Sequence, residues 1–112
     1  MRKSELVDAA LCAAVEEMKQ GLIDADLGGG IVKKRVAFGG RGKRGGNRVI
    51  VATNKGDRWF FIFGFEKNRR DNVTAQELDA LQELAADLLM QSTAQLNLAV
   101  RNGTLQEICH AS

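Results

Sequence analysis

The sequence predicts one α+β domain in which a small, mostly antiparallel β-sheet carries an N-terminal helix or helices and a long helix packed on it. Three observations predict this class. The segments follow the order helix, strands, helices, strand. The links between neighbouring strands have the composition of hairpin loops rather than of helical crossovers. The chain has 112 residues with 45% hydrophobic content, which suits a single core and one domain over residues 1–112.

The N-terminal segment is expected to be a helix that Ser4 caps and Gly21 ends. Apolar residues recur there at spacings of three and four, as an amphipathic helix requires. These residues are Leu6, Val7, Ala10, Leu11, Ala14, Val15 and Met18. A short helical turn is expected at residues 22–27, before three consecutive glycines at 28–30 break the chain.

Three strand-like segments follow, at residues 31–38, 47–53 and 58–65. The third contains an aromatic run at 59–63 without polar alternation, so we expect a central strand that is covered on both faces. Residues 54–57 predict a short hairpin turn, and the stretch from Gly39 to Asn47 predicts a longer glycine-rich loop.

Two capping boxes mark the C-terminal helices, the first in Thr74–Glu77 and the second in Ser92–Gln95. The first begins a long helix that presents one apolar face to the sheet. That face consists of Leu78, Leu81, Leu84, Ala85, Leu88 and Leu89. The second begins a shorter helix that Gly103 ends, and residues 104–109 predict one further strand.

Several classes of protein are excluded by what the sequence lacks. No apolar run approaches the roughly 20 residues of a membrane span, and the N-terminus has no export signal, so we expect a cytoplasmic protein with no membrane partner. Cys12 and Cys109 have no CxxC partner, so we expect reduced thiols and no zinc site. His110 has no catalytic partner in view. We expect no metal and no small-molecule cofactor.

Positive charge is concentrated in the middle of the chain. Residues 33–70 contain twelve Lys and Arg against two acidic residues, a net charge of +10. The flanking segments are acidic, with net charges of −3 over residues 1–32 and −5 over residues 71–112. Such segregation predicts an anionic partner, most commonly the phosphate backbone of a nucleic acid.

The glycine-rich loop matches GxGxxG at residues 40–45, but a dinucleotide site would open a helix, whereas a strand follows here. A phosphate-binding Walker loop is excluded because no Gly-Lys pair precedes Ser or Thr. A basic loop is left, in which Arg41, Lys43 and Arg44 are predicted to contact phosphates. The competing interpretation is an ordinary solvated hairpin loop.

Strand alternation places Lys33 and Arg35 on one face. If Arg48 on the next strand projects to the same side, three cations meet on a rigid platform, which suits a reactive site. The competing interpretation is a solvent-facing sheet surface.

The residues around the end of the third strand are further candidates. Lys67, Asn68 and Arg69 follow that strand, at a position where sites tend to gather, although a plain polar loop would look the same. Phe65 is the one aromatic residue suited to base stacking, and the other aromatic residues of this strand are expected in the core.

Several stretches of the chain form a family-like pattern. They read IVKKRVA at 31–37, GKRGGNRVI at 42–50, FFIFGF at 60–65, KN at 67–68, DN at 71–72 and EL at 77–78. In this order and spacing they resemble the RelE/HigB-like toxins of type II toxin–antitoxin systems. The resemblance covers about residues 28–90, with a weaker match at 103–108.

The resemblance implies a small α+β toxin that cleaves messenger RNA in the decoding site of the ribosome without a metal. It also implies a cognate antitoxin, often a DNA-binding repressor with a helix-turn-helix. By position, the basic active-site roles fall to Lys33, Arg35 and Arg48, and to Lys67 or Asn68. Lys43 and Arg44 would hold RNA. Several members use a tyrosine or histidine near the site, whereas this chain has no tyrosine and its histidine is distant.

Two other functions compete with this one. A related scaffold of the ParE type would block DNA gyrase, and a plain RNA-binding protein would bind without chemistry. RNA cleavage after induction in cells separates these functions, because a gyrase inhibitor would cause DNA damage and a binding protein would cause neither.

Overall fold

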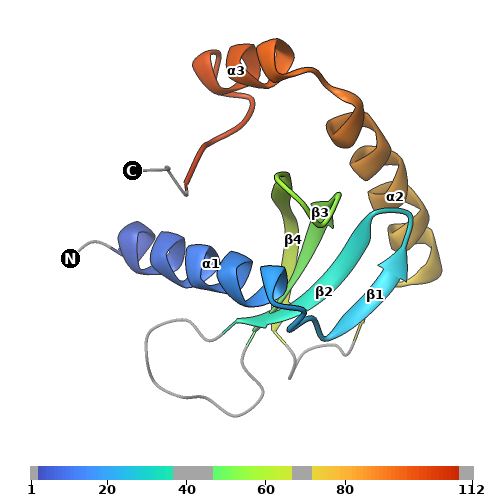
Figure 1. The fold of residues 1–112 in the computed structure, drawn as a ribbon. Coiled ribbons are helices and arrows are strands. Elements are labelled where there is room, and N and C mark those ends of the chain that lie inside the picture. The colour runs from blue at the N-terminus through green and yellow to red at the C-terminus, as the bar shows by residue number, and fades with distance from the viewer. Residues whose placement is uncertain (1–2, 37–46, 67–71, 109–112) are drawn as a thin grey trace.

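The computed structural model describes residues 3–36, 47–66 and 72–108, which form three helices and one four-stranded antiparallel sheet in the order β1-β2-β3-β4 (Figure 1). The predicted α+β class is confirmed. In chain order the elements are α1 (Lys3–Lys19), β1 (Ala25–Gly28), β2 (Ile31–Val36), β3 (Asn47–Thr53), β4 (Trp59–Glu66), α2 (Ala75–Met90) and α3 (Thr93–Arg101).

The first helix ends at a glycine, as its sequence predicts. Gly21 has a φ of +95°, and its N–H donates to the carbonyl of Met18 while the N–H of Leu22 donates to that of Glu17. This pair of bonds is a Schellman motif, which favours glycine because the residue must adopt a left-handed conformation. Ser4 lies within α1, so its predicted role as the N-cap is wrong.

The segment after α1 differs from the prediction. Residues 22–27 do not form a helical turn, because Ala25–Gly28 is a strand that pairs with β2. Ile23 and Leu27 pack into the two different cores on either side of the sheet. Pairing with β2 and this two-sided burial outweigh the weak local preference for a helical turn.

Each face of the sheet has its own helix. The core on the α1 face combines α1 with alternate residues of β2 and β3, and its buried members are Ala14, Val15, Met18, Val32, Val36, Val49 and Val51. The core on the α2 face uses the intervening residues, and its buried members are Ile31, Ile50, Ala52, Ala85 and Leu88. Because β3 contributes to both cores, it is buried from Arg48 to Thr53.

β4 is the last strand in the order of the four described strands, so the prediction of a central strand is wrong, and β2 and β3 are the interior strands. The aromatic run lacks polar alternation because its residues pack into both cores. The β3–β4 ladder also contains a bulge: Val51 pairs with Phe61 and Ile50 pairs with Phe63, which leaves Ile62 without a partner in the ladder. A bulge of this kind shifts the alternation of side chains by one residue.

Both predicted capping boxes are present. Thr74 and Glu77 exchange side-chain and backbone hydrogen bonds at the start of α2, and Ser92 and Gln95 do the same at the start of α3. α2 buries Ala85 and Leu88, whereas α3 buries no residue. Figure 1 shows α2 and α3 as an arm that curves past one end of the sheet.

The chain after α3 returns toward α1 without forming a strand over residues 104–108, so the strand predicted there is wrong over those residues. Leu105 instead packs against the core on the α2 face. Ile108 reaches α1, where its carbonyl oxygen lies 3.5 Å from Sγ of Cys12. Cys12 is disulfide-bonded, so the predicted reduced thiol is wrong for this residue, and Cys109 lies outside the described residues.

Candidate functional site

Transverse rows of paired residues cross the α2 face of the sheet. In an antiparallel pair, residues directly opposite each other project to the same face. From the Val36 end of β2 inward, the outer row is Arg35, Arg48 and Phe65, the middle row is Lys33, Ile50 and Phe63, and the inner row is Ile31, Ala52 and Phe60. The predicted juxtaposition of Lys33, Arg35 and Arg48 on one face is therefore present in the register.

The exposure of the side chains differs between the inner row and the rows farther out. Ile31, Ile50 and Ala52 are fully buried, in the same core as Ala85 and Leu88 of α2. The cations lie farther out: Lys33 is half-buried and Arg35 is exposed. Phe63 is 36% exposed and Phe65 is half-buried. The outer and middle rows thus present two cations and two aromatic rings that remain accessible, on a rigid sheet.

The bulge in β4 brings the two rings to this face. Without it, Phe61, Phe63 and Phe65 would share the α1 face, because strand side chains alternate with a period of two. With it, Phe61 packs toward α1 while the other two rings lie on the face of Arg48, 6.2 Å apart between centroids and tilted by 44°. The sequence indicated Phe65 through its place near the strand end. Phe63 was missed because no local signal in the sequence marks the bulge.

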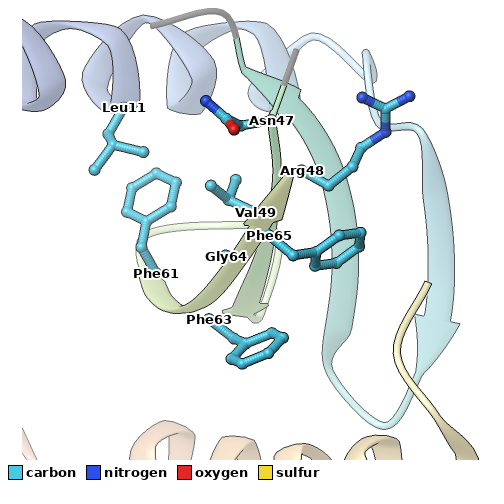
Figure 2. Close-up of a pocket in the computed structure, with 8 residues that line it drawn as sticks. All are labelled: Leu11, Asn47, Arg48, Val49, Phe61, Phe63, Gly64 and Phe65. Atoms are coloured by element: carbon cyan, nitrogen blue, oxygen red, sulfur yellow. The ribbon is translucent and has the colours of Figure 1, made fainter. Parts of the chain in front are cut away.

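A shallow cavity of about 350 Å³ follows the outer part of β4. Its lining residues are Leu11, Asn47, Arg48, Val49, Phe61, Phe63, Gly64 and Phe65. Figure 2 shows that Val49 and Phe61 extend toward α1, whereas Arg48 and Phe65 extend to the other side of the sheet. The hollow is therefore lined by side chains from both faces of the sheet.

Arg48 is buried, with 6% of its surface exposed, and is held by a carboxylate that the sequence reasoning missed. Its Nε lies 3.3 Å from Oδ2 of Asp24, the residue just before β1. Asp24 was missed because residues 22–27 were expected to be helical. Only the pairing of β1 with β2 brings that segment close to the basic rows.

The other basic residue that is buried in the sheet belongs to the opposite face. Nζ of Lys34 lies 2.8 Å from Oε1 of Glu17 on α1, with the lysine side chain 9% exposed and the glutamate 52% exposed. This pair links α1 to β2 beneath the sheet and has no access to the basic rows on the α2 face.

The acidic residues with shifted pKa values lie at the far end of the sheet. A hydrogen bond from Lys55 and one from the N–H of Gly28 hold the pKa of Asp26 below its usual value. The side-chain amide of Asn54 lowers the pKa of Asp57 in the turn between β3 and β4. That turn forms the hairpin predicted at residues 54–57, and it lies at the end opposite to the outer row.

The remaining predicted site residues lie outside the described residues: Arg41, Lys43, Arg44, Lys67, Asn68 and Arg69. Their roles stay predictions. Within residues 3–36, 47–66 and 72–108, no group of three or more His, Cys, Asp or Glu side chains is placed to hold a metal ion. Over the same part of the chain, no helix is both long and apolar enough to cross a membrane.

The arrangement offers specific chemistry. Guanidinium groups supply planar, permanently charged donors that suit phosphate oxygens, and strands hold their starting positions rigidly. The accessible rings of Phe63 and Phe65 suit the flat face of a nucleobase. Exposed Arg35 and these two rings therefore offer contacts to a phosphate and to an unpaired base from the same face of the sheet.

A protein-family model described as the RelE toxin of the RelE / RelB toxin-antitoxin system matches residues 1–108. No curated protein and no solved structure matches the chain.

Proposed function

The chain belongs to the RelE toxin family of toxin–antitoxin systems, and from this membership we propose that it is a ribosome-dependent, metal-independent messenger RNA endonuclease that inhibits translation. The observation that carries the proposal is the outer row, in which Arg35 and Arg48 lie beside Phe65 on one face of the sheet. The proposed substrate is messenger RNA in the decoding site of the ribosome, so the proposed place of action is the cytoplasm.

The proposed reaction is an in-line attack by an RNA 2′-hydroxyl on the adjacent phosphorus. The new bond joins the 2′-oxygen to phosphorus, and the bond to the 5′-oxygen of the next nucleotide breaks. The products are a 2′,3′-cyclic phosphate and a 5′-hydroxyl. Negative charge grows on the phosphoryl oxygens during this displacement, and Arg35 and Arg48 would stabilise it with charged N–H donors.

The reaction also needs one proton removed from the 2′-oxygen and one delivered to the leaving 5′-oxygen. Arginine stays protonated at all ordinary pH values, so it does not act as the base. We assign proton transfer to Lys33, which lies in the middle row next to Arg35, or to Lys67, with a water-mediated route as the alternative.

The exposed ring of Phe63 and the half-buried ring of Phe65 would hold the base next to the scissile phosphate. Stacking on an aromatic ring accepts any base, and removing such a ring typically costs about 1–3 kcal/mol of binding per base. Arg41, Lys43, Arg44, Asn68 and Arg69 are assigned to the surrounding RNA backbone, where cations make binding depend on salt.

The experiment is an in vitro cleavage assay on messenger RNA in ribosomes, in which the chemical ends of the fragments are identified. We expect fragments with 2′,3′-cyclic phosphate and 5′-hydroxyl ends, formed only when ribosomes are present. Fragments with 3′-hydroxyl and 5′-phosphate ends would contradict the mechanism, since those ends indicate activated water as the nucleophile. Intact RNA together with damaged DNA would favour a ParE-like inhibitor of DNA gyrase. Bound but intact RNA would favour an RNA-binding protein without chemistry.

The toxin pairs with an antitoxin, as members of its family do. We propose that this antitoxin is a helix-turn-helix protein whose acidic or helical segment covers the basic region, because residues 33–70 carry a net charge of +10. The affinity of the complex should then fall as salt rises. An affinity that does not respond to salt would contradict electrostatic covering.

A further inference from the structure

We propose that Asp24 is a positioning residue for the cleavage reaction: its carboxylate fixes the guanidinium of Arg48 beside Arg35, where the phosphate of the RNA would bind. This inference rests on the proposed function and assigns a role in it to a residue outside the basic cluster. Asp24 itself touches no reacting atom.

The backbone of Asp24 is anchored to the sheet. Its N–H donates to the carbonyl oxygen of Lys33 over 2.9 Å, so the residue extends the β1–β2 pairing by one position. From there, Oδ2 of Asp24 lies 3.3 Å from Nε of Arg48, with the arginine side chain 7% exposed and the aspartate 29% exposed. The carboxylate thus comes from a fixed strand end rather than from a freely moving surface side chain.

The sheet alone does not determine where the guanidinium of Arg48 lies. Arg48 starts on β3 and its side chain crosses β2 to reach Asp24, as Figure 2 shows for the arginine. A long arginine has many rotamers, and ordering it costs conformational entropy. An ion pair at Nε selects one orientation of the guanidinium plane, whereas the terminal Nη1 and Nη2 carry the remaining donors of the group.

The carboxylate of Asp24 also offsets the repulsion between two positive charges in the outer row. Arg35 and Arg48 are direct partners on β2 and β3, and like charges at such positions repel. The negative charge of Asp24 offsets that repulsion for the buried member of the pair. Arg48 can then stay next to Arg35 in the protein without RNA, so little reorganisation is needed when the phosphate arrives.

An ion pair that only stabilises the fold would have the same geometry as the pair of Asp24 and Arg48. The chain contains a second pair that serves as a matched control for this possibility. Glu17 pairs with the buried Lys34 on the opposite face, so Glu17→Gln removes an acidic partner of a buried sheet cation far from the basic rows. The variants to compare are Asp24→Asn, Asp24→Glu and Glu17→Gln. Each is tested for thermal stability and for kcat and KM of messenger RNA cleavage on ribosomes.

We expect Asp24→Asn to lower kcat by roughly 10- to 100-fold, because a small misplacement of a catalytic group has effects of that size. KM should stay the same or fall, since the variant removes a negative charge near a polyanion. Asp24→Glu should recover most of kcat, and Glu17→Gln should keep it. In an Arg48→Ala background, Asp24→Asn should have no further effect on kcat.

A readout independent of cleavage is the NMR signal of the Arg48 Nε–H. It should exchange slowly with solvent in the wild type and in Asp24→Glu, and fast in Asp24→Asn, with the Arg48 signal unchanged in Glu17→Gln. A folded Asp24→Asn protein with wild-type kcat, or with a protected Nε–H, overturns the inference. If the wild type cleaves no RNA, the proposed function fails, and the exchange measurement still decides whether Asp24 orders Arg48.

Discussion

Arg35 and Arg48 lie directly opposite each other in the β2–β3 register, yet Arg35 is exposed and Arg48 is buried. Two guanidinium groups that start from neighbouring positions therefore have different surroundings. Arg35 faces solvent, and the Nε of Arg48 faces the carboxylate of Asp24. The two residues should accordingly respond differently to substitution.

Arg35→Ala should lower cleavage of ribosome-bound messenger RNA by about 10²- to 10³-fold, the usual cost of removing a donor that stabilises the transition state. Its thermal stability should stay the same or rise slightly, because repulsion with Arg48 is relieved. Arg101→Ala at the exposed end of α3 removes the same charge away from the site and should cleave normally. Equal cleavage by all three proteins would contradict the assigned site.

Arg48→Ala should lose both activity and stability, because it leaves Asp24 without its partner and empties a buried position. Removing one member of a hydrogen-bonded charged pair typically costs about 1–3 kcal/mol, so the loss should be visible in urea unfolding. An Arg48→Ala protein with wild-type stability would mean that the pair with Asp24 contributes little to the fold.

Gly30→Ala should destabilise the fold by about 1–3 kcal/mol, since Gly30 has a φ of +83° in the turn between β1 and β2. A Cβ there would also lie 3.0 Å from Cδ1 of Leu89 on α2. Gly103→Ala is the control, because Gly103 has a φ of +86° but no atom within 4 Å of the added Cβ. Thermal unfolding should show the larger fall in Tm for Gly30→Ala. An equal fall in Tm would mean that backbone strain alone, without the contact to Leu89, accounts for the loss of stability.

The two capping boxes should differ in their effect on global stability. Thr74→Ala should lower the free energy of unfolding by about 1 kcal/mol, because α2 buries residues against the sheet. Ser92→Ala should act mainly on α3, which buries none. Hydrogen exchange measures the difference: we expect faster exchange across the whole fold for Thr74→Ala, and faster exchange confined to α3 for Ser92→Ala.

The pair of Asp26 and Lys55 predicts a small pH dependence. The hydrogen bond from Lys55 lowers the pKa of Asp26 in the folded state, so its contribution to stability is present above the unfolded pKa of about 3.9. That contribution is lost as the pH falls through the lowered folded pKa. Lys55→Gln should raise the pKa of Asp26 toward its usual value, as an NMR titration of the carboxyl carbon would show. An unchanged titration would assign the shift to the N–H of Gly28 instead.

Much of the fold could be predicted where the signal is local. Gly21, Thr74 and Ser92 mark helix ends through backbone geometry or side-chain caps, and these signals depend on neighbours within a few residues. The strand at 47–53 was predicted over its full length because its run of β-branched residues is buried on both faces. The juxtaposition of Lys33 and Arg35 follows from simple alternation.

The remaining features depend on contacts between distant segments. Residues 22–27 become extended only because β2 offers an edge to pair with, and that pairing brings Asp24 to Arg48. The approach of Ile108 to Cys12 depends on the return of the chain after α3. Nothing within a few residues of these positions indicates such contacts, so no reading of local pattern could have found them.

The unpaired Ile62 makes the length of β4 matter more than its composition. β4 has eight residues against seven in β3. The extra residue, Ile62, determines to which face of the sheet each later side chain of β4 projects. Deleting Ile62 would close the bulge and keep Phe63 opposite Ile50 and Phe65 opposite Arg48, on the face of the cations. Closing the bulge at unchanged strand length would instead pair Ile62 with Ile50 and turn Phe63 and Phe65 toward α1. The position of both rings beside the arginines therefore depends on this one extra residue, and a variant without Ile62 should keep it.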